Sequence, residues 1–150
     1  MEKAGNRKYL VSASRRTDML SCRPNHLVKA IRGELKFSRV LKPERIHSLL
    51  ISTKDFRNIL DKKKLRNTCA GCDQVCFNLT ITGFGGTRVE PNVPKPEALL
   101  ERISELVDYL GDPRRITWCF APVLNWNGNS NVSTEIFYDM AKVFSKNGIK

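Results

Sequence analysis

The sequence predicts an α/β fold in which parallel strands alternate with helices, as in a partial TIM barrel of about four βα units. Short apolar runs that suit buried strands alternate along the chain with segments of helical period. Strand, helix and strand in this order imply parallel strands joined by right-handed crossovers. We therefore expect residues 1–150 to form a single domain, equivalent to the amino-terminal half of a (β/α) barrel. An open four-stranded sheet is the alternative.

The first unit is predicted within residues 9–41. Residues 9–14 (YLVSAS) form an apolar run of strand length. A helix is predicted from Pro24, a residue type favoured in the first helical turn, to Gly33, a residue type that commonly ends helices. We expect residues 35–41 to form a short strand or a spur beside the sheet.

The second and third units follow in the same order. Residues 46–52 (IHSLLIS) predict a buried strand, and residues 56–64 predict the helix after it. Residues 74–82 (QVCFNLTIT) predict the third strand. The apolar side chains of residues 97–110 recur at helical spacing and form one wide stripe, and Gly111 comes just past its end. This stripe predicts a helix over these residues more clearly than any other segment of the chain does.

The fourth unit combines a strand at residues 116–120 with a helix at residues 136–144 that ends at residues 147–148. A fifth strand is due where the sequence stops at Lys150. We therefore expect the chain to be a fragment of a longer barrel protein. Half a barrel exposes two strand edges, which predicts self-association through those edges.

Charge is distributed unevenly along the sequence. The formal net charge is +11, and residues 1–70 hold 18 Lys and Arg against 6 Asp and Glu, whereas residues 71–150 hold 8 against 9. A basic half favours phosphate or nucleic acid as a partner, although a solvated surface gives the same composition. No early apolar leader and no apolar run of bilayer length occur, so we expect a cytoplasmic protein without a membrane partner.

Polar and glycine-rich groups follow each predicted strand, at the end where α/β proteins place their sites. These groups are residues 14–18, 53–55, 83–86 with 90–92, and 121–122 with 125–126. In the first group, Arg15 and Arg16 are suited to hold a carboxylate or phosphate through paired hydrogen bonds, and Asp18 is suited to orient them. An internal salt bridge is the structural alternative.

Five sequence blocks, in order, resemble the signature blocks of the bacterial and archaeal family called domain of unknown function 1848. The blocks are SASRRTD (12–18), STKDF (52–56), LTITGFG (79–85), EPNVP (90–94) and RITW (115–118) followed by Pro122. The resemblance runs from about residue 9 to the last residue. The family's activity is not established.

The resemblance implies a TIM barrel related to radical S-adenosylmethionine enzymes such as the spore photoproduct lyases. Full-length members are expected to carry an iron–sulfur cluster and S-adenosylmethionine, held by cysteines near the end of a longer chain. Nothing in this sequence corresponds to that region, so the chain resembles the amino-terminal half only and no cofactor is expected in it. Ser52 replaces a Trp of the family pattern, and Cys119, Phe120 and Ala121 replace an Arg, an aromatic residue and an Asp.

We therefore expect a radical S-adenosylmethionine-like barrel fragment whose polar, anion-holding site is incomplete or inactive as an enzyme. Candidate catalytic residues are Arg15, Arg16, Asp18, Lys54, Asp55 and Glu90. Candidate contacts to a small-molecule or anionic ligand are Ser14, Thr17, Thr82, Gly83, Gly85, Asn92 and Trp118. The alternative function is a non-catalytic module that binds phosphate or nucleic acid through the basic half. Nucleic acid is the weaker partner, since no aromatic residues are interleaved with the basic ones.

Three of the five cysteines, Cys69, Cys72 and Cys76, are spaced almost as a metal site requires. They precede and enter the third predicted strand, so they lie at its amino end, away from the predicted site. A cluster needs thiolates that converge on one point, and zinc needs a fourth ligand such as His26 or His47. We therefore interpret the cysteines as separate thiols, with metal binding as the disfavoured alternative.

Overall fold

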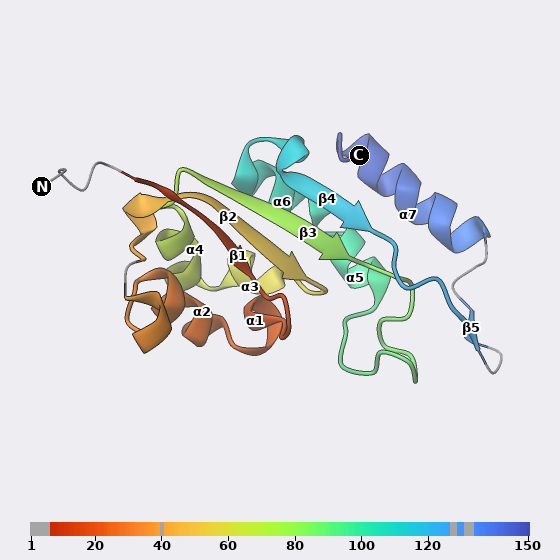
Figure 1. Cartoon of the computed structure of the whole chain (residues 1–150). Coiled ribbons are helices and arrows are strands. Elements are labelled where there is room, and N and C mark those ends of the chain that lie inside the picture. The colour runs from red at the N-terminus through yellow and green to blue at the C-terminus, as the bar shows by residue number, and fades with distance from the viewer. Residues whose placement is uncertain (1–6, 40, 127–128, 131–133) are drawn as a thin grey trace, which may run out of the picture.

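A single four-stranded sheet organises the structure, a computed structural model that describes residues 7–39, 41–126, 129–130 and 134–150. Its strands are β1 (Tyr9–Ala13), β2 (Ile46–Thr53), β3 (Gln74–Thr80) and β4 (Ile116–Cys119). They lie in the order β1-β2-β3-β4 and every neighbouring pair is parallel (Figure 1). The predicted α/β fold with four parallel strands is confirmed.

In the described part of the segment between β1 and β2, every regular element is helical. It contains α1 (Met19–Cys22), α2 (Pro24–Ile31) and the short 3-10 helices η1 (Lys36–Ser38) and η2 (Pro43–Arg45). Of the two alternatives predicted for residues 35–41, the strand was therefore wrong. The Ser38 amide donates a hydrogen bond to the Leu35 carbonyl and closes a tight turn, so these residues form a spur beside the sheet. Gly33 (φ 71°) permits this turn, since a Cβ there would lie 2.3 Å from the Leu41 carbonyl oxygen.

Two helices, α3 (Arg57–Asp61) and α4 (Lys63–Cys69), replace the single helix predicted at residues 56–64. The buried residues Ile59 and Leu65 explain the break, because six positions in one continuous helix turn through about 240° and would point them to different faces. Lys62 takes an extended conformation (φ −100°, ψ 96°) between the two helices. This break rotates α4 relative to α3, so Ile59 and Leu65 can both be buried.

The helical segment predicted at residues 97–110 likewise forms α5 (Pro96–Leu100) and α6 (Ile103–Leu110), which share the predicted apolar stripe. The 3-10 helix η3 (Pro113–Arg115) then leads into β4. After β4, β5 (Asn125–Trp126) and β6 (Asn129–Ser130) form an antiparallel pair that the sequence did not predict. The last helix, α7 (Thr134–Lys146), contains the predicted one.

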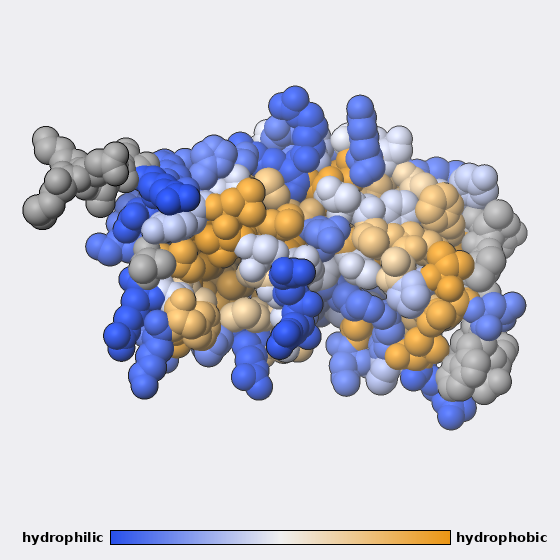
Figure 2. Space-filling model, in the orientation of Figure 1, coloured by the Kyte–Doolittle hydropathy of each residue, from blue (hydrophilic) through white to orange (hydrophobic). Residues whose placement is uncertain are grey.

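The two faces of the sheet differ in character. Leu49, Ile51, Phe77 and Leu79 point to one face and are at most 1% exposed, because they form the core with the helices. Their neighbours on the strands point to the other face and are half-buried or exposed: Ser12, Leu50, Ser52, Gln74, Cys76, Asn78, Thr80 and Thr117. Helices therefore cover one face, and the other, called here the open face, is mixed polar and apolar (Figures 1 and 2).

None of the helices in the described part of the chain combines the length and apolar character needed to cross a membrane.

Candidate functional site

Asp18 connects the loop after β1 to the end of β2. Its Oδ1 atom accepts a hydrogen bond of 2.9 Å from the Ser21 amide and caps α1, while Oδ2 accepts bonds of 2.8 Å from the Thr53 hydroxyl and from the Lys54 amide. Both carboxylate oxygens are thus used by the backbone and by a buried hydroxyl. Asp18 holds two loops together, whereas the sequence predicted that it would orient the arginines.

The loop between Ser14 and Asp18 carries two exposed cations. Ser14 begins the loop with a φ of 69°, and its hydroxyl oxygen accepts a hydrogen bond of 3.1 Å from the Met19 amide. Arg15, Arg16 and Thr17 follow on the surface. Among the described residues, neither guanidinium group makes a hydrogen bond or an ion pair. Both groups are therefore available to an anion.

The segment after β2 is fixed by hydrogen bonds of its own. The Thr53 hydroxyl group lies 2.9 Å from the Asp55 carbonyl oxygen and accepts a bond of 3.0 Å from the Asp55 amide. The Asp55 carboxylate pairs through two bonds, of 2.9 and 2.8 Å, with the Arg57 guanidinium. This contact raises the pKa of Arg57 above its ordinary value. Asp55 thus precedes α3, accepts a hydrogen bond of 3.1 Å from the Arg57 amide and is occupied by an internal ion pair.

Glu90 joins the loop after β3 to the loop after β2. Its Oε1 atom pairs with the Lys54 ammonium group, and its Oε2 atom accepts a hydrogen bond of 3.0 Å from the Thr82 hydroxyl. The Glu90 side chain is only 12% exposed, whereas that of Lys54 is 34% exposed. The pair therefore lies at the rim of the site, with the carboxylate on the inner side.

A glycine-rich turn brings Glu90 to this position. Gly83 has a φ of 85°, and Gly85 forms a β-bridge with Glu90. A Cβ at Gly85 would lie 1.9 Å from the Pro94 carbonyl oxygen, so only glycine fits there. Asn92 lies exposed at the tip of the same loop.

Trp118 belongs to an aromatic cluster with α7. Its ring stacks on Phe144 with centroids 4.5 Å apart and on Phe137 with centroids 5.4 Å apart. The indole N–H donates a hydrogen bond of 3.1 Å to the Ile81 carbonyl. These contacts place the ring on the helix-covered face, so packing accounts for it and a contact to ligand stays a prediction.

The comparison with family models gives one match, to the model described as Domain of unknown function (DUF1848), over residues 10–148. The chain belongs to this family. No curated protein and no solved structure matches it. The DUF1848 match covers every loop described above, and the three loops after β1, β2 and β3 are linked to one another by Asp18, Lys54 and Glu90.

The cysteines suggested as metal ligands do not converge in this DUF1848 chain. Cys69 ends α4 and Cys72 follows it, both buried on the helix-covered face, whereas Cys76 points to the open face of β3. Burial raises the pKa of the Cys69 thiol to about 12 and that of Cys72 to about 11, which disfavours the thiolates that metals bind. Within the described ranges, no three His, Cys, Asp or Glu side chains are placed to hold a metal ion.

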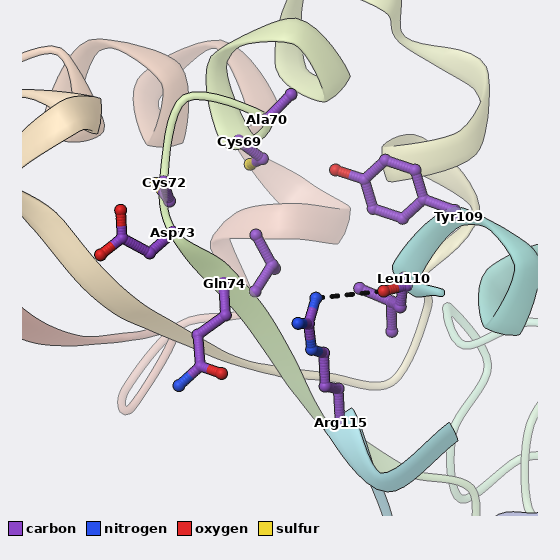
Figure 3. A pocket seen from close by; sticks show the side chains of 9 residues that line it. Cys69, Ala70, Cys72, Asp73, Gln74, Tyr109, Leu110 and Arg115 are labelled. Atoms are coloured by element: carbon purple, nitrogen blue, oxygen red, sulfur yellow. Dashed lines mark hydrogen bonds between the residues drawn. The ribbon is translucent and has the colours of Figure 1, made fainter. Parts of the chain in front are cut away.

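Cys69 and Cys72 instead line a pocket of about 220 Å³ at the amino end of the sheet (Figure 3). Tyr109 and Arg115 border it, and the Arg115 guanidinium donates a hydrogen bond of 3.1 Å to the Leu110 carbonyl. The pocket is at the opposite end of the strands from the loops that carry Arg15 and Lys54, so it forms no part of that site.

The structure connects four of the thirteen residues that the sequence selected. Asp18, Lys54, Thr82 and Glu90 are connected by hydrogen bonds or an ion pair, directly or through Thr53. Thr53 itself was missed as a site residue. A hydroxyl two positions before an Asp is a signal for such a turn, because it can accept the amide of that Asp.

Proposed function

We propose that the chain binds a small anionic molecule at the carboxyl ends of its strands, with Arg15 and Arg16 holding a phosphate or carboxylate group. The observation that carries the proposal is that these two guanidinium groups lack internal partners among the described residues, while the ends of their loop are fixed. Arginine suits this role because its planar fork donates two parallel hydrogen bonds to such an anion.

The neighbouring charges support binding in preference to a complete catalytic apparatus. Asp18, Asp55 and Glu90 each already pair with a hydroxyl, an amide or a cation. Carboxylates engaged in this way serve as a scaffold for the loops, whereas Arg15 and Arg16 have no internal partner among the described residues. The proposal therefore includes the expectation that this chain alone is inactive as an enzyme. We also propose that the chain is related in fold to radical S-adenosylmethionine barrels. The sequence resemblance and the parallel sheet support this relation.

Titration calorimetry with inorganic phosphate and pyrophosphate tests the proposal. We expect pyrophosphate to bind, and the Arg15→Gln/Arg16→Gln variant to bind it at least tenfold more weakly, because each charge-assisted hydrogen bond contributes about 1.5 kcal/mol or more. Arg39→Gln is the matched control. Arg39 is exposed and directly follows η1, at the other end of the strands, so its variant should bind like the native chain.

Equal binding by the double variant and the native chain contradicts the proposal, as does the absence of any binding at low salt. A single-stranded oligonucleotide tests the alternative function in the same instrument. Tight oligonucleotide binding that falls steeply with salt, and that pyrophosphate does not displace, identifies the basic half as a nucleic-acid surface and overturns the small-anion proposal.

A further inference from the structure

Both edges of the sheet are open in the described part of the chain. β1 pairs only with β2, and β4 pairs only with β3. Each edge therefore presents backbone N–H and C=O groups without a strand partner, which is the usual template for pairing with another chain.

The strand register is staggered as in a barrel. Ala13, Ile51, Phe77 and Ile116 lie in one row across the sheet. β1 ends at this row, whereas β4 begins at it. An eight-stranded barrel slips by about eight residues in a full circuit, hence by about four across each half. With a displacement of four residues, the whole of β4 in one copy of the chain lies opposite residues 9–12 of β1 in a second copy. The two open edges therefore match in length and position.

Exposed apolar side chains are concentrated at the same two edges. The seven exposed large hydrophobic residues of the described chain are Leu10, Phe37, Val123, Leu124, Ile136, Phe137 and Tyr138. The first two lie beside β1, and the other five lie beside the end of β4 and on the start of α7, where Figure 2 shows a second apolar area. None lies over the middle of the sheet.

One edge also carries an apolar pocket, and the other carries an exposed aromatic side chain. Beside β1, a pocket of about 230 Å³ opens between the strand and α2, lined by Val11, Leu27, Ile31 and Phe37 among others. Beside β4, Tyr138 projects from α7 with 58% of its surface exposed. In a barrel, the helix after one strand packs against the next strand of the circuit, so α7 would meet a pocket of this kind.

We propose that two copies of this chain associate about a two-fold axis parallel to the strands and close an eight-stranded barrel. The β1 edge of each copy pairs with the β4 edge of the other, and α7 of each copy packs into the pocket beside β1 of the other. The open faces, which are mixed polar and apolar, then line the interior. The proposal is independent of the anion site, although closure brings the Ser14–Asp18 loops of both copies to one rim.

The charge distribution favours pairing of the β1 edge with the β4 edge over pairing of two β1 edges. Residues 1–70, which include β1 and β2, hold 18 Lys and Arg against 6 Asp and Glu, whereas residues 71–150 hold 8 against 9. Pairing β1 with the partner's β4 therefore places a strongly basic half beside a nearly neutral one. Pairing β1 with the partner's β1 would set the two basic halves against each other, which repulsion disfavours.

Sedimentation equilibrium on the purified chain tests the proposal. We expect a mass of twice the 17.1 kDa of one chain. Tyr138→Glu and Phe37→Glu, one at each edge, should each raise the dimer dissociation constant at least tenfold, since each buries a charge in both junctions. Asn67→Glu adds the same charge on the exposed side of α4, over the middle of the sheet, and should leave the dimer intact.

Circular dichroism on each variant confirms that the helices are retained, because both substituted side chains are exposed in the monomer. A native chain that sediments as a monomer overturns the proposal. A dimer that neither edge variant weakens overturns it as well, since association then uses another surface.

Disulfide crosslinking tests which edges meet. Leu10 and Thr117 both point to the open face at opposite edges, and the displacement of four residues places them opposite each other across the junction. In a background where Cys22, Cys76 and Cys119 are serine, Leu10→Cys/Thr117→Cys should oxidise to a covalent dimer. Leu10→Cys alone should stay uncrosslinked, because the two β1 strands lie on opposite sides of the barrel. Crosslinking of the single variant instead shows β1 paired with β1 and contradicts the proposal.

Discussion

Replacement of Asp18 by alanine is the sharpest test of how the loops at the carboxyl ends of the strands are held. The Asp18 carboxylate accepts three hydrogen bonds, from the Ser21 amide, the Thr53 hydroxyl and the Lys54 amide. The first caps α1, and the other two bind the end of β2 to the loop after β1. In Asp18→Ala all three donors lose their acceptor, and the two loops lose their direct connection.

The expected loss follows from these three contacts. An N-cap contributes about 1 kcal/mol to the free energy of unfolding. The two bonds from Thr53 and Lys54 contribute about 1 kcal/mol each, which is below the range of about 1.5–3 kcal/mol for charged acceptors because Asp18 is only half-buried. We therefore expect Asp18→Ala to lower the free energy of unfolding by about 3 kcal/mol. In Asp18→Asn the amide oxygen can still cap α1, but the amide NH₂ group is a donor and cannot accept a hydrogen bond from the Lys54 amide. We therefore expect this variant to lose about half as much free energy as Asp18→Ala.

Urea unfolding followed by circular dichroism measures these losses. Asp108→Ala, which removes an exposed carboxylate from α6, is the matched control and should change the free energy by less than about 0.5 kcal/mol. A loss below about 1 kcal/mol for Asp18→Ala would refute the reasoning, because the carboxylate would then connect the loops only weakly. So would equal losses for the alanine and asparagine variants.

Two further predictions concern the glycine-rich turn and the buried thiols. Gly85→Ala should lower the urea midpoint by the equivalent of about 1–3 kcal/mol, because its Cβ would overlap the Pro94 carbonyl oxygen; an unchanged midpoint contradicts the packing described. Folding raises the pKa values of Cys69 and Cys72 from 9.0 to about 12 and about 11, so above pH 9 the unfolded chain releases protons that the folded chain retains. Their contribution to stability is therefore intact below pH 9 and decreases as the pH rises towards 11. Urea midpoints at pH 8 and pH 10 should show a smaller decrease in Cys69→Ala/Cys72→Ala than in the native chain, and equal decreases contradict the assignment.

The sequence predicted the four strands of the parallel sheet well, because each is a short apolar run. Their order was also predictable, because neighbours in the sheet are neighbours in the chain. The helix at residues 56–64 was predicted less well, since its two halves bury residues that are out of helical phase, and only the packing of Ile59 and Leu65 reveals the break. The turn at residues 36–38 depends on backbone hydrogen bonds that composition does not encode. The local sequence pattern thus predicted whether a segment forms a helix or a strand, and tertiary packing determined where the helices are interrupted.

The candidate site shows the same division. Its location followed from topology, because the carboxyl ends of parallel strands meet at one edge. Its pairings did not, since Lys54 and Glu90 are 36 positions apart, as are Asp18 and the Lys54 amide that it binds. The role of Asp18 could not be read from its neighbours Arg15 and Arg16, because its partners come from another strand. Which carboxylate meets which cation depends on loop geometry that the sequence does not specify.

The stacking of Trp118 between Phe137 and Phe144 gives the chain an internal optical reporter. The chain contains two tryptophans, so Trp126→Phe leaves Trp118 as the sole indole fluorophore. Its emission wavelength then reads the polarity at the junction between β4 and α7, and a red shift signals that the helix has separated from the strand. The attachment of the last helix can therefore be followed in real time, apart from the unfolding of the sheet that circular dichroism records.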